Sequence, residues 1–276
     1  MPVITLTSDF GLLDHRVAAI KGSILSLNED IKIVDITHDI EAYNLKETAY
    51  IVRNAYKYFP KGTVHIISVD SFYRKGMRSI LYKADGHYFI ATDNGILNLI
   101  FYNIKPELVY EITFNNRFED EVNFPSTDVF VPAAVHLCNG GLPEVIGRPC
   151  LDPLDSKFPK AVFNKAEKMI IGEAMYIDNF GNIVSNIDKK FFLKNQANFS
   201  GFTIRFRSLA ISHVYSHYTE FIDNWEDERS YHGKSIALFN DVGLLELSIY
   251  KGNKNNGART LFGMNVGEKI YVEFYK

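Results

Sequence analysis

The first 70 residues alternate between two hydrophobic periods, and this alternation restricts the fold more than any other feature of the chain. Short β-branched runs typical of buried strands are separated by stretches in which apolar residues recur every three to four positions, as in a helix. The β-α-β-α-β order predicts right-handed crossovers and a largely parallel sheet covered by helices. We expect the strands over residues 3–8, 31–37 and 62–70 and the helices over 14–27 and 44–58.

The remainder of this half predicts one hairpin and two helices. Two β patterns flank Asp85-Gly86, a dipeptide that favours a tight hairpin turn. A short apolar helix is expected after Asn94-Gly95. A longer helix, capped by Thr127 or Asp128, is expected to run through Asn139 and to stop at the two glycines that follow.

The pattern changes after Pro149. Residues 150–160 contain two prolines and several turn-forming residues, which predicts a linker. Beyond Lys168 short strand patterns dominate, with one brief helical candidate over 188–195, as in a small β-barrel or sandwich. We therefore expect an α/β domain over residues 1–155, a linker over 156–167 and a β-barrel domain over 168–276.

Charge and cysteine content narrow the class of protein. With 30 basic and 33 acidic residues the formal net charge is -3, so the chain lacks the basic footprint typical of nucleic-acid binding. Two cysteines, Cys138 and Cys150, cannot form a disulfide scaffold or a Cys-rich metal site. No signal peptide or membrane-spanning run is visible. We expect a cytoplasmic protein that binds neither nucleic acid nor membrane.

Two aspartates stand where strands of the expected sheet end. Asp9 follows the first strand, and one carboxylate there can accept hydrogen bonds from both hydroxyls of a ribose. The same residue also suits a cap for the helix that follows. Asp70 closes the third strand and precedes a loop, residues 71–77, that is both aromatic and basic. Ligands of open α/β sheets bind at this edge, so Asp70 either acts on a ligand or caps its own loop.

Other polar motifs are ambiguous or argue against a metal. The residues from Asp178 to Asn182 join two strand patterns and fit a hairpin turn better than a binding site. Asp93-Asn94-Gly95 is a turn signal that could also mark a site. His213 and His217 lie four apart without an evident third ligand, so no metal is expected. The chain has no glycine-rich phosphate-binding motif, GxSxG or HExxH, and these patterns alone define no reaction.

Seven stretches occur in order from the first strand to the barrel. They are SDFG (8–11), VAAIKG (17–22), IVDITHDI (33–40), YFPKGTVHIISVD (58–70), DNGIL (93–97), FVPAAVHL (130–137) and DNFGNIVSNI (178–187). Together they resemble the S-adenosyl-L-methionine hydroxide adenosyltransferase family, which is related to fluorinases and chlorinases. The resemblance implies an N-terminal Rossmann-like α/β domain, a C-terminal β-barrel and a homotrimer. It also implies active sites between the N-terminal domain of one subunit and the C-terminal domain of the next.

The family reaction that this resemblance implies is attack of a nucleophile on the 5′ carbon of S-adenosylmethionine, with release of methionine. Hydroxide gives adenosine, whereas halide gives a 5′-halo-5′-deoxyadenosine. S-adenosylmethionine is then the substrate, and no separate cofactor is expected.

Four residues match substrate-binding positions of that family. Asp9 matches the acid that holds the ribose hydroxyls, and Tyr43 matches an aromatic residue beside the sugar and the methionine end. Asp178 and Asn182 match barrel residues that contact the amino-acid moiety and the ribose region. Around the adenine, relatives carry an asparagine and small residues. Residues 248–257 instead contain a tyrosine and a polar insertion, which departs from the family pattern.

The residues that activate water in hydroxide-transferring relatives are incomplete in this chain. Those relatives read VDPGVG, two further residues and RR, and later TFHGRD, and an Asp, an Arg and a His from these motifs act on the water. The aspartate is retained as Asp70, but Met77 stands at the first arginine, before Arg78, and Pro125 stands at the histidine. The catalytic candidates that remain are Asp70 as the base and the Ser126 hydroxyl as its aid.

Three functions fit this combination. We expect hydrolysis of S-adenosylmethionine, because a lost proton-transfer group typically costs ~10²–10⁴-fold in rate while positioning is kept, and Arg74 or Lys75 could supply a charge. Halide transfer ranks lower: Ser126 matches the serine that contacts halide in fluorinases, but Asp70 stands where those enzymes have a tyrosine, and its charge repels an anion. The third candidate is a protein that binds an adenosyl ligand without useful turnover.

Overall fold

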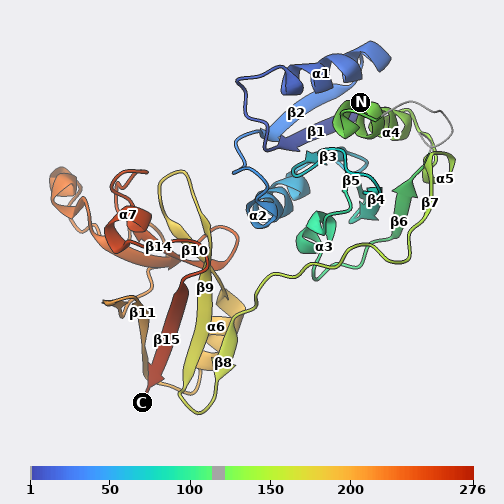
Figure 1. Ribbon diagram of the computed structural model, residues 1–276. Helices are drawn as coiled ribbons and strands as arrows, with labels where there is room; N and C mark the ends of the chain where they lie inside the picture. The colour runs from blue at the N-terminus through green and yellow to red at the C-terminus, as the bar shows by residue number, and fades with distance from the viewer. Residues whose placement is uncertain (1, 114–121) are drawn as a thin grey trace. The chain divides into compact units, whose positions relative to one another are not determined.

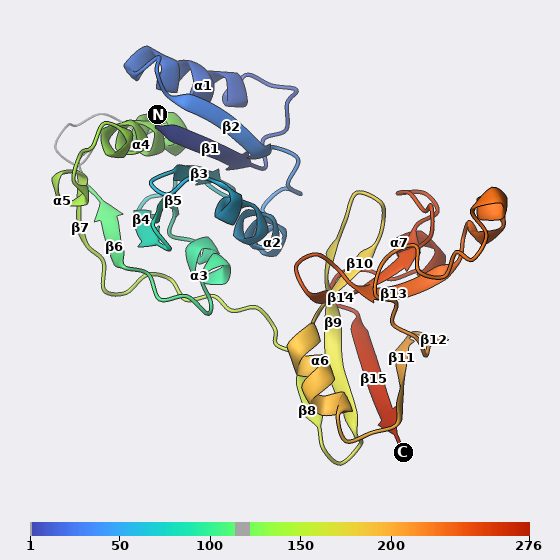
Figure 2. The ribbon, with the colours of Figure 1, turned by 180° about the vertical axis from the view of Figure 1, so that it is seen from behind.

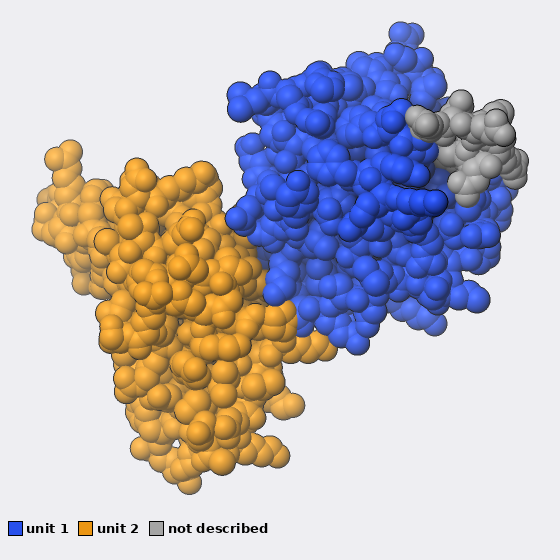
Figure 3. Space-filling model, in the orientation of Figure 1, with its two compact units in different colours: residues 1–158 blue, residues 159–276 orange. Residues whose placement is uncertain are grey.

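The structure is a computed structural model that describes residues 2–113 and 122–276. It divides into two compact units, residues 1–158 and residues 159–276 (Figure 3). Each unit has its own sheet and its own hydrophobic core, so the chain is a mixed α/β protein with two separate sheets. Within the residues described, no helix combines the length and the apolar character that a membrane span requires.

The first unit is built on one sheet that begins with parallel strands. The three strands expected first are present as β1 (Val3–Ser8), β2 (Lys32–Thr37) and β3 (Val64–Ser68). β1 lies between β2 and β3, and β3 also pairs in parallel with β5 (His87–Thr92). The described strands follow the order β2-β1-β3-β5-β4-β6-β7. The carboxyl ends of the four parallel strands therefore meet at one edge of the sheet.

The rest of this sheet is antiparallel, so the expectation of a largely parallel sheet holds only for those four strands. β4 (Ser79–Ala84) and β5 form the predicted hairpin, and Asp85 and Gly86 both have positive φ (49° and 74°), as a tight turn of this kind requires. Two strands that the sequence did not predict, β6 (Leu108–Ile112) and β7 (Gly147–Pro149), continue the sheet beyond β4. Both are mostly half-buried or exposed and lack a clear hydrophobic period.

Helices cover both faces of this sheet, as the two ribbon views show (Figures 1 and 2). α1 (Arg16–Leu27) and α4 (Val131–Cys138) pack on one face, and α2 (Leu45–Ala55) and α3 (Ile96–Ile100) pack on the other. Successive side chains of β3 alternate between these two cores, as the two-residue period of a strand demands. The remaining short helices of this unit are η1 (Tyr56–Tyr58) and α5 (Pro143–Ile146).

The helix expected to be capped by Thr127 or Asp128 begins earlier, so that prediction was wrong. A π-helical turn, η3 (Ser126–Phe130), leads into α4, with Pro125 directly before it. Asp128 lies inside this turn, and its Oδ2 accepts the backbone N–H groups of the two residues before Pro125, at 3.0 and 2.8 Å. The aspartate therefore holds the preceding loop in place. A proline suits a helix start because its missing N–H would have no partner there.

The second unit is an almost closed, barrel-like sheet. Its described strands follow the order β12-β11-β15-β9-β10-β14-β13, with β8 beside β9, and a bridge from Tyr215 to Leu238 of β13 joins the chain after β12 to the other end of this order. The short strands expected beyond Lys168 and the helix expected over 188–195 are present. The elements are β8 (Val162–Asn164), β9 (Met169–Ile177), β10 (Ile183–Asp188), α6 (Lys189–Gln196), β11 (Gly201–Phe206), β12 (Leu209–Ile211), η4 (Trp225–Tyr231), β13 (Ser235–Phe239), β14 (Leu244–Ile249), α7 (Ala258–Phe262) and β15 (Lys269–Tyr275).

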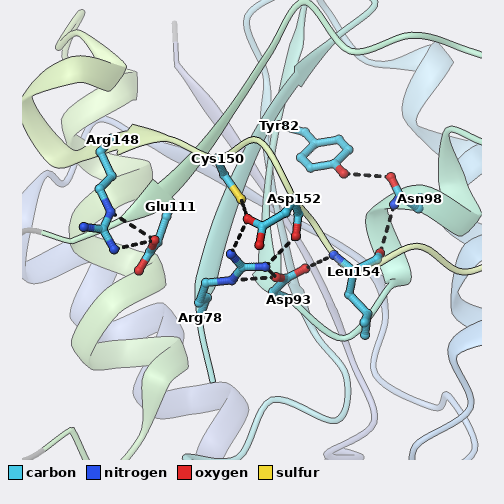
Figure 4. A network of polar contacts seen from close by, with 9 residues as sticks. All are labelled: Arg78, Tyr82, Asp93, Asn98, Glu111, Arg148, Cys150, Asp152 and Leu154. Carbon is cyan, nitrogen blue, oxygen red and sulfur yellow. Dashed lines mark hydrogen bonds and ion pairs between the residues drawn. The ribbon is translucent and has the colours of Figure 1, made fainter. Parts of the chain in front are cut away.

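Residues 150–158 have no regular structure, yet they are attached to the first unit (Figure 4). The Arg78 guanidinium donates to the carboxylate and to the carbonyl oxygen of Asp152, at 2.8 and 2.7 Å. The Leu154 N–H donates to Asp93 Oδ1 at 2.9 Å. The expected linker, residues 156–167, is not entirely irregular, because it contains β8, which pairs with β9.

Candidate functional site

Asp9 follows β1 directly and lies at the edge where the parallel strands end. Its Oδ2 accepts the backbone N–H of Tyr43 at 2.9 Å and that of Asp70 at 3.3 Å. Tyr43 precedes α2 and Asp70 follows β3, so one carboxylate oxygen joins three segments that are far apart in the sequence. The structure thus brings together three of the candidate residues.

Both residues that donate to Asp9 have an unusual backbone conformation. The φ angle is 65° at Tyr43 and 47° at Asp70. This left-handed region costs a non-glycine residue roughly 1–2 kcal/mol, and a bulky side chain rarely adopts it. Strain of this kind persists only where the surrounding structure imposes it, and it concentrates at functional sites. Here the two strained residues are those whose N–H groups both donate to the Asp9 carboxylate.

The second oxygen of Asp9 has no partner in the part of the chain that the structure describes. Oδ1 is buried and accepts no hydrogen bond there. Leaving a buried acceptor unpaired costs about 1–3 kcal/mol, and more for a charged group, so native structures rarely do so without a reason. An ionised carboxylate accepts from hydroxyl donors. Asp9 is therefore suited to bind the hydroxyls of a sugar.

The Asp70 carboxylate, 34% exposed, is free of hydrogen bonds to the described residues. No backbone N–H of residues 71–77 bonds to it, so it does not cap that loop. Its backbone is fixed instead, because Asn94 Nδ2 donates to the carbonyl oxygens of Val69 at 3.0 Å and of Asp70 at 3.4 Å. Arg74 Nη2 lies 3.9 Å from Asp70 Oδ2. The carboxylate is thus held in position and left open to a ligand.

Arg78, which follows Met77, is engaged elsewhere (Figure 4). Its Nε and Nη2 donate to Asp93 Oδ2 at 2.9 and 2.5 Å, in addition to the two bonds to Asp152. The Asp93 side chain is only 6% exposed, so this pair is largely buried. Arg78 therefore fastens the segment after β7 to the first sheet and is not available to Asp70.

Ser126 is completely buried at the start of η3. Its Oγ donates to Ser68 Oγ at 2.8 Å, at the end of the strand that leads to Asp70. Among the residues described, no hydrogen bond joins Ser126 to Asp70. The serine hydroxyl therefore supports the end of β3.

Sequence reasoning missed an aromatic cluster at the same edge. The ring centroid of Phe10 lies 6.1 Å from that of Phe72 and 5.5 Å from that of Phe124. The Arg16 guanidinium lies 6.0 and 5.8 Å from the Phe10 and Phe72 centroids, within reach of a cation–π contact. The available signal was an aromatic residue one or two positions after each strand-end aspartate.

Asp178 and Asn182 lie in the second unit, in the turn between β9 and β10. Asp178 Oδ1 accepts the backbone N–H groups of Phe180 and Asn182, both at 2.8 Å, and its Oδ2 accepts Asn182 Nδ2 at 2.8 Å. Asp178 thus builds the hairpin turn that the sequence pattern favoured. Asn182 Oδ1 is buried and unpaired within the described part of the chain. The turn therefore leaves this acceptor unused.

Glu246 of β14 is a buried carboxyl group that sequence reasoning also missed. Its oxygens accept Ser248 Oγ at 2.7 Å and Asn240 Nδ2 at 3.3 Å. Burial raises the pKa of Glu246, the bond from Ser248 opposes this, and the charge of Asp178 raises the pKa further. No local sequence signal distinguishes this glutamate from a solvent-facing one.

The part of the second unit that departs from the family pattern packs inside the unit. Tyr250 is buried, and its hydroxyl donates to Glu228 at 2.6 Å. The polar insertion, residues 253–257, lies against the β9–β10 turn, since a Cβ on Gly181 would come within 3.2 Å of the Asn253 carbonyl oxygen. The insertion therefore contacts the turn that carries Asp178 and Asn182.

Fold and site together define an α/β protein with a carboxylate site at the carboxyl edge of its first sheet and a barrel-like second unit. Sequence models of the SAM hydroxide adenosyltransferase N-terminal domain and C-terminal domain match residues 4–147 and residues 172–271. The chain belongs to the S-adenosyl-L-methionine hydroxide adenosyltransferase family.

Several known proteins are similar to this chain over most of its length. The (R)-S-adenosyl-L-methionine hydrolase of Methanocaldococcus jannaschii is 29% identical over 259 residues, which cover 92% of this chain and 90% of the relative. A fluorinase of Actinopolyspora mzabensis is 26% identical over 215 residues, covering 68% and 72%. The crystal structure of an uncharacterized conserved protein from Thermotoga maritima superposes with a TM-score of 0.83 at 26% identity and covers 99% of both chains.

Proposed function

We propose that this protein cleaves S-adenosylmethionine by attack of water on the 5′ carbon, giving adenosine and methionine. The observation that carries the proposal is the Asp9 carboxylate, which Tyr43 and Asp70 orient and which keeps one buried oxygen unpaired. That oxygen is placed to accept a ribose hydroxyl, and Asp70 stands beside it. Membership of the family and similarity to hydrolases over most of the chain support the same activity.

The chemistry asks mainly for placement of the reactants. The water oxygen forms a bond to the 5′ carbon as the carbon–sulfur bond breaks, and the bonding pair neutralises the sulfonium. Methionine leaves as a neutral thioether, so no general acid is needed, and one proton of the water must be removed. Positioning can contribute up to ~7–11 kcal/mol, whereas a proton-transfer group typically contributes ~10²–10⁴-fold in rate. A site without the relatives' arginine and histidine can therefore still be active.

We assign the proton transfer to Asp70. Its carboxylate is partly exposed and is not used by its own loop, and Arg74 adds a positive charge 3.9 Å away. Ser126 acts through Ser68 by supporting the strand end. We assign binding of the ribose to Asp9 and Tyr43, and binding of the amino-acid end and the ribose region to Asp178 and Asn182.

Halide transfer fits this arrangement less well. A halide must lose its water to hydrogen-bond donors in a site without negative charge. Ser126 is buried and already bonded to Ser68, and the Asp70 carboxylate faces the same strand edge. Pro125 supplies no backbone donor. Water is therefore the nucleophile that we propose.

Incubation with S-adenosylmethionine in ¹⁸O-labelled water, with and without chloride, tests this assignment. We expect adenosine and methionine in equal amounts, the label in the 5′ hydroxyl, and no effect of chloride. A 5′-chloro-5′-deoxyadenosine product would instead favour halide transfer. Saturable binding of S-adenosylmethionine without any product would favour a binding protein that lacks turnover.

Finer features of the protein are part of the same proposal. We propose that the first unit is a Rossmann-like domain over residues 1–155, that the barrel domain spans residues 168–276, and that the protein is cytoplasmic. We also propose a homotrimer in which the first unit of one subunit and the second unit of the next act on one substrate. The exposed Leu12 and Leu13, in the loop that follows Asp9, support a protein contact at that loop.

A further inference from the structure

Ser8, His38 and Asp35 form a line of polar contacts behind the Asp9 loop. Ser8 Oγ lies 2.7 Å from His38 Nδ1, and the two residues are 1% and 4% exposed. Asp35 Oδ1 lies 3.2 Å from His38 Nε2, in a geometry too bent for a full hydrogen bond, so this contact is electrostatic. Lys21 Nζ donates to the other Asp35 oxygen at 2.6 Å. The function proposed above uses none of these groups.

The local shape of β2 explains how Asp35 and His38 meet. Residues three positions apart point to opposite faces of a regular strand. Here the pairing with β1 shifts, because Leu6 pairs with Asp35 and Thr7 pairs with Thr37. The extra residue makes a bulge, which bends a strand and re-aims its side chains. The carboxylate and the imidazole therefore lie within contact distance.

A serine, a histidine and an aspartate in a row suggest a nucleophile, but burial excludes that role for Ser8. Its side chain has almost no exposed surface, so no substrate atom can approach Oγ. The same oxygen also accepts the backbone N–H of Phe10 at 3.4 Å. Ser8 is therefore a structural link between His38 and the loop that carries Asp9.

The hydrogen bonds can all run in one direction. Burial raises the pKa of Asp35, but the hydrogen bond from Lys21 and the contact with His38 outweigh it and the pKa is lowered, so this carboxylate stays charged. A charged carboxylate beside Nε2 favours the proton on that nitrogen, which leaves Nδ1 of His38 to accept the Ser8 hydroxyl. Ser8 in turn accepts from Phe10. Phe10 thus donates to Ser8 and Ser8 donates to His38, whose Nε2 lies beside the charged Asp35 carboxylate.

We infer that Ser8, His38 and Asp35, which we call the relay, position Asp9 for the ribose hydroxyls. Asp9 lies between Ser8 and Phe10, both of which the relay holds. The His38 carbonyl oxygen also accepts the N–H of Gly11 at 2.8 Å, so His38 fixes the loop through its ring and through its backbone. The inference rests on the proposed adenosyl site, but the orientation of Asp9 can be measured without a ligand.

The ligand-free test is amide hydrogen exchange by NMR in Ser8→Ala, which removes the hydroxyl with little change in volume. We expect the two backbone amides that donate to Asp9 to exchange about tenfold faster, while amides of the sheet core are unchanged. Thr5→Val is the matched control, because Thr5 Oγ1 makes a contact of the same 2.7 Å length with the buried His65, also from β1. Equal exchange of the two amides in Ser8→Ala and in the native protein would overturn the inference.

The ligand test compares the affinities for adenosine and 2′,3′-dideoxyadenosine by calorimetry. We expect the native protein to prefer adenosine, Asp9→Asn to lose most of this preference, and Ser8→Ala and His38→Gln to reduce it about tenfold. Thr5→Val should keep it. Equal weakening of both ligands in the relay variants would mean a merely structural role and would contradict the inference. A native protein that binds neither ligand would refute the adenosyl site. Amide exchange would still test whether the relay positions Asp9.

Discussion

At the scale of single residues, the site depends on two aspartates with different surroundings. Asp9 has one oxygen held by two backbone N–H groups and the other buried and unpaired among the described residues. Asp70 has a partly exposed carboxylate that accepts no hydrogen bond from the described residues and lies 3.9 Å from the Arg74 guanidinium. The first arrangement suits a fixed binding group, and the second suits a group that takes up a proton.

Asp70→Asn tests the role of the free carboxylate. The amide keeps the shape of the side chain but cannot take a proton, so we expect adenosine formation to fall by ~10²-fold or more while the Kd for S-adenosylmethionine is kept. Asp85→Asn is the control, because Asp85 is also an aspartate with positive φ (49°) but lies in the β4–β5 turn. An unchanged rate of adenosine release in Asp70→Asn would refute the role as base.

Arg74→Met is expected to have a much smaller effect. The contact between Arg74 and Asp70 is 3.9 Å long and the arginine is 63% exposed. Exposed ion pairs of this kind contribute ~0–1 kcal/mol, which corresponds to no more than about fivefold in rate. Lys75→Met, on the same loop, should leave kcat unchanged. A loss of a hundredfold in Arg74→Met would show that Arg74 contacts the reacting atoms.

At the scale of elements, β3 carries a histidine that burial keeps neutral. Burial, together with the neighbouring His87 ring 3.2 Å away, lowers the pKa of His65 to about 3. Above pH 6.5 the histidine is neutral in both the folded and the unfolded chain. Between pH 6.5 and 3 only the unfolded chain binds the proton. The free energy of unfolding should therefore fall by about 1.4 kcal/mol for each unit by which the pH is lowered in this range. Urea unfolding at several pH values measures this slope, and His65→Leu should have a shallower one; parallel slopes would contradict the assignment.

The attachment of residues 150–158 belongs to the same scale. Arg78→Met removes the charged partner of the buried Asp93 carboxylate and leaves it only the N–H of Leu154, so we expect a loss of roughly 2–3 kcal/mol in the free energy of unfolding. Arg148→Met is the comparison, since Arg148 is 69% exposed in its pair with Glu111 and should cost less than about 1 kcal/mol (Figure 4). Equal losses in chemical denaturation would mean that Arg78 does not hold this segment.

At the scale of the whole molecule, the proposed binding residues are divided between two units, each with its own core. The homotrimer that we propose predicts a species of three times the chain mass in sedimentation at micromolar concentration. Replacing the exposed Leu12 and Leu13 by glutamate should weaken the assembly and lower activity together, because charge disfavours an apolar contact. A stable, active monomer would rule out a site composed of residues from different subunits.

Many of the strands and helices in both units could be predicted from the sequence, because hydrophobic period and turn residues act between near neighbours. The β4–β5 hairpin at Asp85-Gly86 and the turn at Asp178 are local in this sense. The strands β6 and β7 were missed because short, half-exposed edge strands carry little hydrophobic signal. Motif matching also named Asp9, Tyr43 and Asp70, but as separate positions.

Only the tertiary structure decided which side chains meet. Asp9 accepts N–H groups from residues 34 and 61 positions away because β1 lies beside β3 and close to the start of α2. Ser8 reaches His38 across the sheet edge, and the bulge in β2 lets the same histidine meet Asp35. Such pairings depend on strand order and register, which arise from packing over the whole sheet and leave no mark in any short stretch of sequence.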